Sequence, residues 1–215
     1  MKRVLTAAIL AAPLAANATL MLCDGPAGCT SQGPDMENVL MPAVGTIGNP
    51  IIGTTHPTNT EVEVSAFEQM VVTGGGQAKL EAVDGLLEYV RIDAVDPAIG
   101  FEHVVFNVHA NITGSVQVVA WDNFGTAFDF GLNPASQTGQ NFFSIGSDDE
   151  QWIDYWEISG VGITGIDELQ QVRVNPGELP CIENCGGDPR SVSEPGAFAL
   201  LGLGLCGLFA ARRRK

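Results

Sequence analysis

Hydrophobic and polar residues alternate with a period of two along most of the chain from residue 60 onward. The alternation is clearest over 104–112, where apolar side chains occupy every even position and Asn or His occupies most of the odd ones. Because successive side chains of a strand point to opposite faces, this pattern predicts a half-buried antiparallel strand. Shorter alternating runs over 61–64 and 87–93 predict two more strands.

Further short strands follow, and turn-forming segments separate them. These strands are predicted over 115–121, 126–130, 141–145, 151–158 and 169–174. The turns, over 122–125, 131–134 and 146–149, are rich in Gly, Asn and Asp. No segment has the i, i+3, i+4 periodicity of a capped amphipathic helix. Many short strands joined by such turns are typical of an all-β fold, so we expect an antiparallel β-sandwich over 59–174.

The residues on either side of this region lack the alternation. Residues 19–58 are rich in Gly, Pro, Asn and Thr, so we expect an irregular lead-in with one short strand around Ile51-Ile52. Residues 175–192 are polar and again rich in Pro and Gly, which is typical of a linker. This linker would hold the C-terminal segment clear of the folded domain.

The N-terminus has the three parts of a secretory signal peptide. Lys2 and Arg3 precede an apolar run over 4–16, and Ala16-Asn17-Ala18 supplies small residues at both positions of an A-x-A cleavage site. We therefore expect a signal helix over 1–18 that signal peptidase removes after Ala18.

The C-terminus combines an apolar segment with a basic end. Residues 197–211 carry no charge, and as a helix they would span about 22 Å at ~1.5 Å per residue. With Gly196 and the flanking arginines, this segment comes close to the roughly 30 Å hydrocarbon core, so we expect a transmembrane helix over 196–211. The basic end would stay on the cytoplasmic side. A buried core helix is the alternative, but such a helix would show a polar face.

The order of motif, helix and basic cluster resembles the PEP-CTERM sorting signal of exopolysaccharide-producing Gram-negative bacteria. The resemblance covers 193–215, with Ser193 where the family usually has its first proline. It implies processing by an exosortase near the motif, transient insertion in the inner membrane, and delivery to the cell surface or extracellular matrix. The residues that it assigns to sorting are Ser193, Glu194, Pro195, Gly196, Arg212, Arg213 and Arg214.

A second resemblance concerns the body of the chain. The segments 140–145, 152–159 and 167–174 look like the closing strands of jelly-roll domains of the discoidin-like or carbohydrate-binding type. This resemblance implies a jelly-roll-like sandwich and assigns no binding residues.

Charge narrows the range of partners. The formal net charge is −15, but six of the ten Lys and Arg residues lie in the two terminal segments. Without those six, four basic residues stand against 25 acidic ones, a charge of −21 (4 minus 25). Nucleic acid is therefore not an expected partner, because phosphate binding needs a basic surface. Cations fit better, although an acidic surface also serves solubility.

Four cysteines are expected to form disulfides in an oxidising periplasm. They are Cys23, Cys29, Cys181 and Cys185, whereas Cys206 lies in the apolar tail and should be unpaired. Two local loops, 23–29 and 181–185, are the favoured pairing. Bonds that join the two ends of the domain, and a zinc site, are the alternatives.

Three carboxylates in a predicted loop are candidate calcium ligands: Asp148, Asp149 and Glu150. Adjacent side chains cannot all face one ion in an extended loop, so backbone carbonyls or Asp122 would have to complete the shell. The alternative interpretation is a solvated run of charge.

The aromatic residues near the C-terminal end of the domain form two sets. In a regular strand, Trp152 and Trp156 would share one face, and Ile153 and Tyr155 the other. One set must be core, and the other could stack on sugar rings if it is exposed.

No catalytic constellation is apparent in the sequence. Asp154 and Glu157 are an odd number of residues apart and would face opposite sides of a regular strand, which argues against a glycosidase pair. His56, His103 and His109 are scattered, and no Gly-x-Ser-x-Gly elbow is present. We therefore expect a non-enzymatic protein that requires no cofactor, with calcium as the possible exception.

These observations predict an exported cell-surface or exopolysaccharide-matrix protein with a structural, adhesive or glycan-binding role. Extracellular polysaccharide is the expected partner. The alternative is a secreted hydrolase that acts on polysaccharide, which would need two carboxylates converging in a groove.

Overall fold

The computed structural model describes residues 20–24, 35–137, 141–147 and 151–179. Within these ranges the regular structure is β-strand throughout, and every strand pairing is antiparallel. The strands are β1 (Leu20–Asp24), β2 (Glu37–Leu40), β3 (Ile47–Gly48), β4 (Ile51–His56), β5 (Glu61–Ala66), β6 (Met70–Val72), β7 (Lys79–Ala82), β8 (Tyr89–Ala94), β9 (Ile99–Ala110), β10 (Gly114–Asp122), β11 (Ala127–Ala135), β12 (Asn141–Ser147), β13 (Ile153–Gly160) and β14 (Ile166–Glu178).

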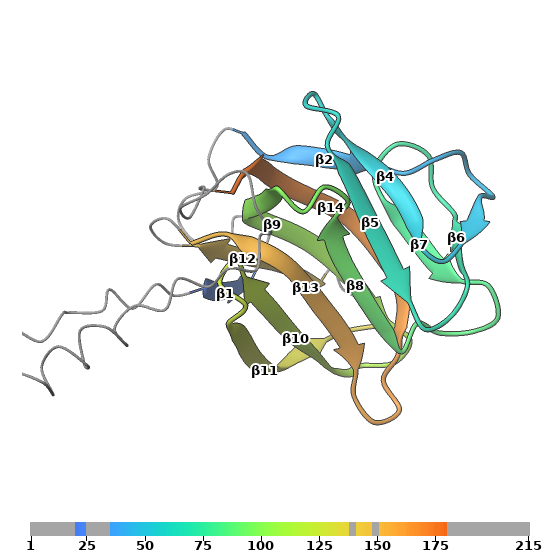
Figure 1. The fold of residues 1–215 in the computed structure, drawn as a ribbon. Helices are drawn as coiled ribbons and strands as arrows, with labels where there is room; N and C mark the ends of the chain where they lie inside the picture. The colour runs from blue at the N-terminus through green and yellow to red at the C-terminus, as the bar shows by residue number, and fades with distance from the viewer. Residues whose placement is uncertain (1–19, 25–34, 138–140, 148–150, 180–215) are drawn as a thin grey trace, which may run out of the picture. The chain divides into compact units, whose positions relative to one another are not determined.

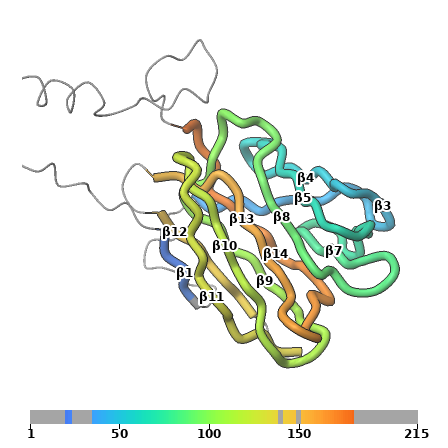
Figure 2. The backbone as a smooth tube through the Cα atoms, turned by 60° about the horizontal axis from the view of Figure 1, so that its bottom comes forward, coloured from blue at the N-terminus to red at the C-terminus, as the bar shows by residue number. Residues whose placement is uncertain are grey.

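The strands form two layers (Figures 1 and 2). The front sheet has the order β11-β10-β13-β8-β5-β4, and the rear sheet has the order β1-β12-β9-β14-β7-β6-β3. Strand β2 pairs with both β4 and β14 and so joins the two sheets along one side. This arrangement confirms the prediction of an all-β sandwich-like fold.

Aromatic side chains from both sheets meet between the layers. Trp156 of the front sheet contacts Phe101 edge-on, with ring centroids 5.6 Å apart, and stacks on Phe106 at 6.1 Å. Phe143 packs against Phe106 from the neighbouring rear strand. All four side chains are almost completely buried, and each such burial stabilises the fold by roughly 1.5–3 kcal/mol or more.

An extra residue in β13 changes which of its side chains face the core. Trp121 pairs with Tyr155 and Asp122 with Ile153, so Asp154 has no partner on β10 and forms a β-bulge. Ile153 and Trp156 are therefore both fully buried, although a regular strand would place them on opposite faces. The prediction that Ile153 shares a face with Tyr155, and Trp152 with Trp156, was wrong for this reason.

The lead-in holds more structure than expected. Four strands, β1 to β4, lie within residues 20–56, where the sequence indicated one short strand. Strand β4 alternates strictly between buried and exposed positions, but Gly53, Thr54 and Thr55 are too small and polar to show this alternation as hydrophobicity. At the other end, β14 continues to Glu178, into the segment interpreted as a linker.

Strand β9 is buried on both faces, and the prediction of a half-buried strand was wrong. Val104, Phe106 and Val108 face the core as expected, but Asn107 on the other face is also 0% exposed. Alternation reports the polarity of a face and not whether that face is covered.

The described ranges contain no helix that is long and apolar enough to cross a membrane. The predicted signal helix over 1–18 and the predicted transmembrane helix over 196–211 lie outside these ranges.

Candidate functional site

The outer face of the front sheet carries aromatic and charged side chains. In β8 the even positions are buried in the core, and the odd positions point outward. The antiparallel register continues this outer face across β8, β13 and β10. Its residues are Tyr89, Arg91 and Asp93 of β8, Tyr155, Glu157 and Ser159 of β13, and Gln117, Val119 and Trp121 of β10.

One end of this face is a stack of side chains from three neighbouring strands. The Trp121 and Tyr155 rings are nearly parallel, with centroids 4.6 Å apart, and the guanidinium carbon of Arg91 lies 3.6 Å from the Tyr155 centroid. The ring separation matches the ~4.7–4.9 Å spacing of adjacent strands, so the rings stand on edge above the sheet. Both faces of the Tyr155 ring are therefore covered, and it offers no ring face to a ligand.

A second aromatic pair lies further along the same face. Tyr89 and Phe67, the residue after β5, are stacked with centroids 4.6 Å apart. The Tyr89 hydroxyl donates a 2.6 Å hydrogen bond to Glu157 Oε1, which fixes the position of its ring. Phe67 is 74% exposed, so one face of its ring rests on Tyr89 and the other is open to solvent.

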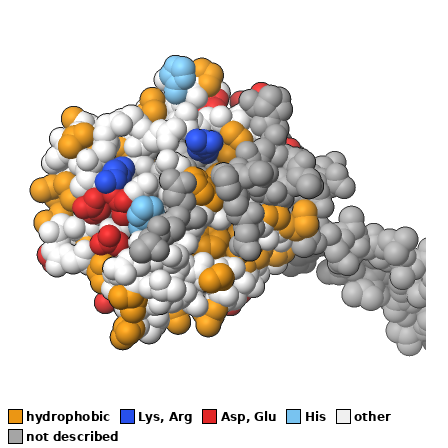
Figure 3. Space-filling model, turned by 180° about the vertical axis from the view of Figure 1, so that it is seen from behind, with side chains coloured by type: hydrophobic (Ala, Val, Ile, Leu, Met, Phe, Trp, Pro, Cys, Tyr) orange, Lys and Arg blue, Asp and Glu red, His pale blue; other side chains and the backbone are white. Residues whose placement is uncertain are grey.

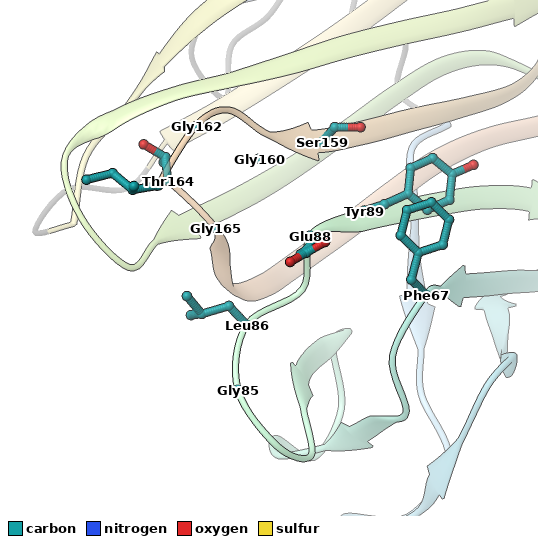
Figure 4. A pocket seen from close by; sticks show the side chains of 11 residues that line it. Phe67, Gly85, Leu86, Glu88, Tyr89, Ser159, Gly160, Gly162, Thr164 and Gly165 are labelled. Carbon is teal, nitrogen blue, oxygen red and sulfur yellow. The ribbon is translucent and has the colours of Figure 1, made fainter.

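The Phe67 and Tyr89 rings border a cleft of about 690 Å³. Figure 4 shows the two rings on one side of the cleft, Leu86 and Thr164 on the other, and Glu88 between them. The remaining lining residues are Gly85, Ser159, Gly160, Gly162, Ile163 and Gly165. Ile163 is 84% exposed, so the cleft has apolar side chains open to solvent on both sides.

Backbone hydrogen bonds hold the two loops of the cleft together. Leu87 and Ile166 exchange two such bonds of 2.9 Å, and the Gly160 amide donates to the Glu88 carbonyl at 2.9 Å. The loops approach so closely that a Cβ at Gly165 would lie 2.9 Å from the Leu86 side chain. The cleft is therefore formed by the fold itself, before any ligand is present.

The electrostatics of this region favour uncharged or cationic ligands. Arg91 is the one cation on the described front face, and it is paired with Asp93 at 2.6 Å. Burial, followed by the hydrogen bond to Glu157, raises the pKa of Tyr89, so its hydroxyl keeps its proton at neutral pH. Glu88 adds an exposed carboxylate to the cleft.

The predicted calcium ligands Asp148, Asp149 and Glu150 lie outside the described residues. Asp122, which would complete their shell, has both carboxylate oxygens engaged. Oδ1 accepts hydrogen bonds from the amides of Phe124 and Thr126, and Oδ2 accepts one from Gln151. Among the described residues, no group of three or more His, Cys, Asp or Glu side chains could hold a metal ion.

Cys23 lies on β1 and is disulfide-bonded. Cys29, Cys181 and Cys185 lie outside the described residues, as do the sorting residues Ser193 to Gly196 and Arg212 to Arg214. The choice between local and end-to-end disulfide pairing stays a prediction.

The remaining sequence candidates are dispersed. His103 and His109 are both on the outer face of β9, whereas His56 ends β4. The bulge changes the relation between Asp154 and Glu157, but neither residue lines the cleft, whose acidic side chain is Glu88.

Sequence reasoning missed Phe67 and Tyr89. Tyr89 lies on the polar side of a predicted strand, and this position indicated an aromatic side chain on the outer face of the sheet. Phe67 follows the alternating run 61–64 by three residues, and its pairing with Tyr89 depends on the β5–β8 register, which local sequence does not show.

Comparison with known proteins adds the following. Residues 191–215 match the model of the PEP-CTERM protein-sorting motif. A search of curated proteins gave no match. Two solved structures of the family 29 carbohydrate-binding module CBM29-2 are similar, both aspartate-to-alanine mutants. The one complexed with mannohexaose is 8% identical and has a TM-score of 0.33, with 66% of this chain and 90% of that chain covered. The other is 9% identical and has a TM-score of 0.28, with 74% and 85% covered. Similarity at this level identifies neither a family nor a ligand for the body, and the sorting motif is the part of the chain that is recognised.

Proposed function

We propose that this chain is exported, is sorted to the cell surface or exopolysaccharide matrix through its PEP-CTERM motif, and there binds glycan without catalysis. The observation that carries the glycan-binding part is the open face of the Phe67 ring, held by Tyr89 at the edge of a preformed cleft.

The cleft has the two kinds of group that sugar binding uses. The apolar faces of pyranose rings stack on aromatic rings, and Phe67 has such a face free. Sugar hydroxyls need hydrogen-bond partners, and Glu88, Ser159 and several residues of the 160–165 loop line the same cleft. The absence of an unpaired cation on the described front face favours neutral or amino sugars over acidic ones there.

The composition of the cleft also supports a binding role over hydrolysis. Glycosidases use two carboxyl groups on opposite sides of the scissile bond. Glu88 is the one acidic side chain among the described residues that line the cleft, and Glu157 is engaged by the Tyr89 hydroxyl.

Polysaccharide retention tests this proposal. The full chain, kept in detergent, would be run through gels or columns that contain neutral, amino and acidic polysaccharides, with and without calcium. We expect retention on at least one neutral or amino polysaccharide, weakened about tenfold or more by Phe67→Ala, which corresponds to about 1.4 kcal/mol.

Phe124→Ala is the matched control. Phe124 is 56% exposed, but it lies in the β10–β11 turn, at the opposite end of β13 from the cleft. Its removal should change retention less than twofold. No retention on any polysaccharide in either calcium condition, or equal effects of the two substitutions, would refute glycan binding at this cleft.

A further inference from the structure

The outer face of the rear sheet brings a second set of polar side chains together. The register places Phe142 of β12 opposite Asn107 of β9, Asn107 opposite Gln170 of β14, and Gln170 opposite Lys79 of β7. Paired residues of antiparallel strands lie on the same face, so these side chains form one row across the sheet. Figure 3, seen from behind, shows basic, acidic and histidine side chains on this side of the molecule.

Part of this face is internally neutralised. Lys79 forms ion pairs with Glu168 and, at 3.7 Å, with Glu81. Glu168 also accepts a hydrogen bond from Gln170 and lies 3.6 Å from Nδ1 of His109. The hydrogen bond to Glu168 raises the pKa of Lys79, so the ammonium stays charged. Lys79, Glu81, Glu168 and Gln170 are therefore partners of one another and need no ligand.

Arg173 and Asn107, beside this group, do not have such partners. Asn107 is 0% exposed, and neither its Nδ2 nor its Oδ1 has a hydrogen-bond partner. Arg173 pairs with no described carboxylate, and its buried Nε has no hydrogen-bond partner. The buried Nε2 of His109 also has no hydrogen-bond partner. A buried polar group without a hydrogen-bond partner destabilises the folded state, so several such groups on one face call for an explanation.

The register brings these groups within reach of one ligand. Arg173 is opposite Val105, which precedes Asn107 by two residues on the same face, so the two are diagonal neighbours roughly 7–8 Å apart. His109 follows Asn107 by two residues on that face, a further ~7 Å along the strand. The unpartnered groups thus follow β9 as a strip, with the half-buried Phe142 ring beside it.

We propose that this strip binds a sugar acid, such as a uronic acid residue of a polysaccharide. Guanidinium and amide N–H groups donate hydrogen bonds to a carboxylate, and the unpartnered Oδ1 of Asn107 requires a donor, which a sugar hydroxyl supplies. A simple anion would leave Oδ1 without a partner. Because Asn107 is closed to solvent, binding requires movement of the atoms that cover it.

This inference does not rest on glycan binding at the Phe67 cleft, because the two sites are on different sheets. The two sites also differ in charge preference, since the cleft is acidic and this strip contains a guanidinium that pairs with no described carboxylate. One site can therefore fail its test while the other passes.

Calorimetric titration of the full chain tests the proposal, with oligogalacturonate as the probe and the neutral galactose oligomer and acetate as comparisons. We expect oligogalacturonate to bind at least tenfold more tightly than either comparison. Arg173→Gln should weaken that binding at least tenfold, and Asn107→Ala should weaken it at least fivefold. The Asn107 side-chain amide should also shift in NMR spectra when oligogalacturonate is added to the unmutated chain.

Lys79→Gln is the matched control, because it removes one positive charge from the same face without touching the proposed contacts. We expect it to change affinity by less than about threefold. Equal losses for Lys79→Gln and Arg173→Gln would mean that long-range attraction alone draws the anion, and would overturn the proposal. The proposal would also be overturned by equal affinity for acetate, by the absence of binding, or by an Asn107 amide signal that does not shift. In those cases ordered water would be the partner of these polar groups. Should Arg173→Gln fail to fold, Arg173→Lys, which keeps the charge but loses Nε, takes its place with the same expectation.

Discussion

Asp154 is the added residue of the β13 bulge, and its carboxyl group is held in an unfavourable environment. Burial, and then the negative charge of Asp93, raises its pKa above the ordinary 3.8. The folded protein therefore retains this proton at pH values where the unfolded chain has lost it, so stability falls as pH rises from about 3.8 through the higher folded-state pKa. The loss is complete once the pH lies above both pKa values.

Replacement by a neutral amide should remove that loss. Asp154→Asn is expected to raise the melting temperature at pH 7, by a few degrees at most, and to have little effect near pH 3.5. Asp167→Asn, at an exposed position of β14, is the control and should change neither value. Thermal unfolding, followed by circular dichroism at both pH values, measures these melting temperatures. An unchanged or lower melting temperature for Asp154→Asn at pH 7 would contradict the prediction.

At Gly177 the prediction concerns packing, because neighbouring side-chain atoms fill the space beside it. It pairs with Gly100 of β9, and a Cβ at residue 177 would overlap the Trp152 ring. Gly177→Ala should therefore lower the free energy of unfolding by about 1–3 kcal/mol. Gly75→Ala, whose Cβ would meet Val44 at an ordinary 3.8 Å, should cost much less. Denaturant titration compares them, and equal costs would show that overlap with Trp152 is unimportant.

Among the elements, the β10–β11 turn depends on one buried carboxylate. Asp122 is 2% exposed and accepts three hydrogen bonds, from the amides of Phe124 and Thr126 and from the Gln151 side chain. Asp122→Ala should cost about 2–4 kcal/mol of unfolding free energy, because it leaves buried donors without an acceptor. Asp129→Ala removes an exposed acceptor of two hydrogen bonds and should cost much less. Similar losses of unfolding free energy for the two variants would show that the burial of Asp122 does not make its hydrogen bonds more important.

Much of the fold at this scale could be predicted from sequence, and the exceptions have physical causes. Strands β8 and β10 show period-two alternation, because one face of each contacts the core. Strand β4 does not, since Gly and Thr fill its inward positions. The bulge at Asp154 was missed because an added residue leaves no local sequence mark. The candidate cleft was missed because Phe67 and Tyr89 meet through strand pairing.

For the whole molecule, the sorting motif and the body make separate predictions. If the motif at 191–215 is functional, mass spectrometry of the native protein should find chains that end near Ser193. Substitution of Pro195 by alanine should increase the proportion of uncut chain in the membrane fraction. An intact tail in all native molecules would mean that the motif anchors the chain without being processed.

The central claim, that Phe67 stacks on a glycan, is tested most directly by the ring signals of phenylalanine. The full chain, labelled with carbon-13 in its phenylalanine rings, would be titrated with a fragment of the polysaccharide that retains it, and each signal would be assigned by substitution. We predict that the Phe67 signal shifts in a saturable manner, while that of the exposed Phe124 does not. A fixed Phe67 signal at saturating glycan, or equal shifts of both rings, would contradict the assignment of this cleft as the binding site.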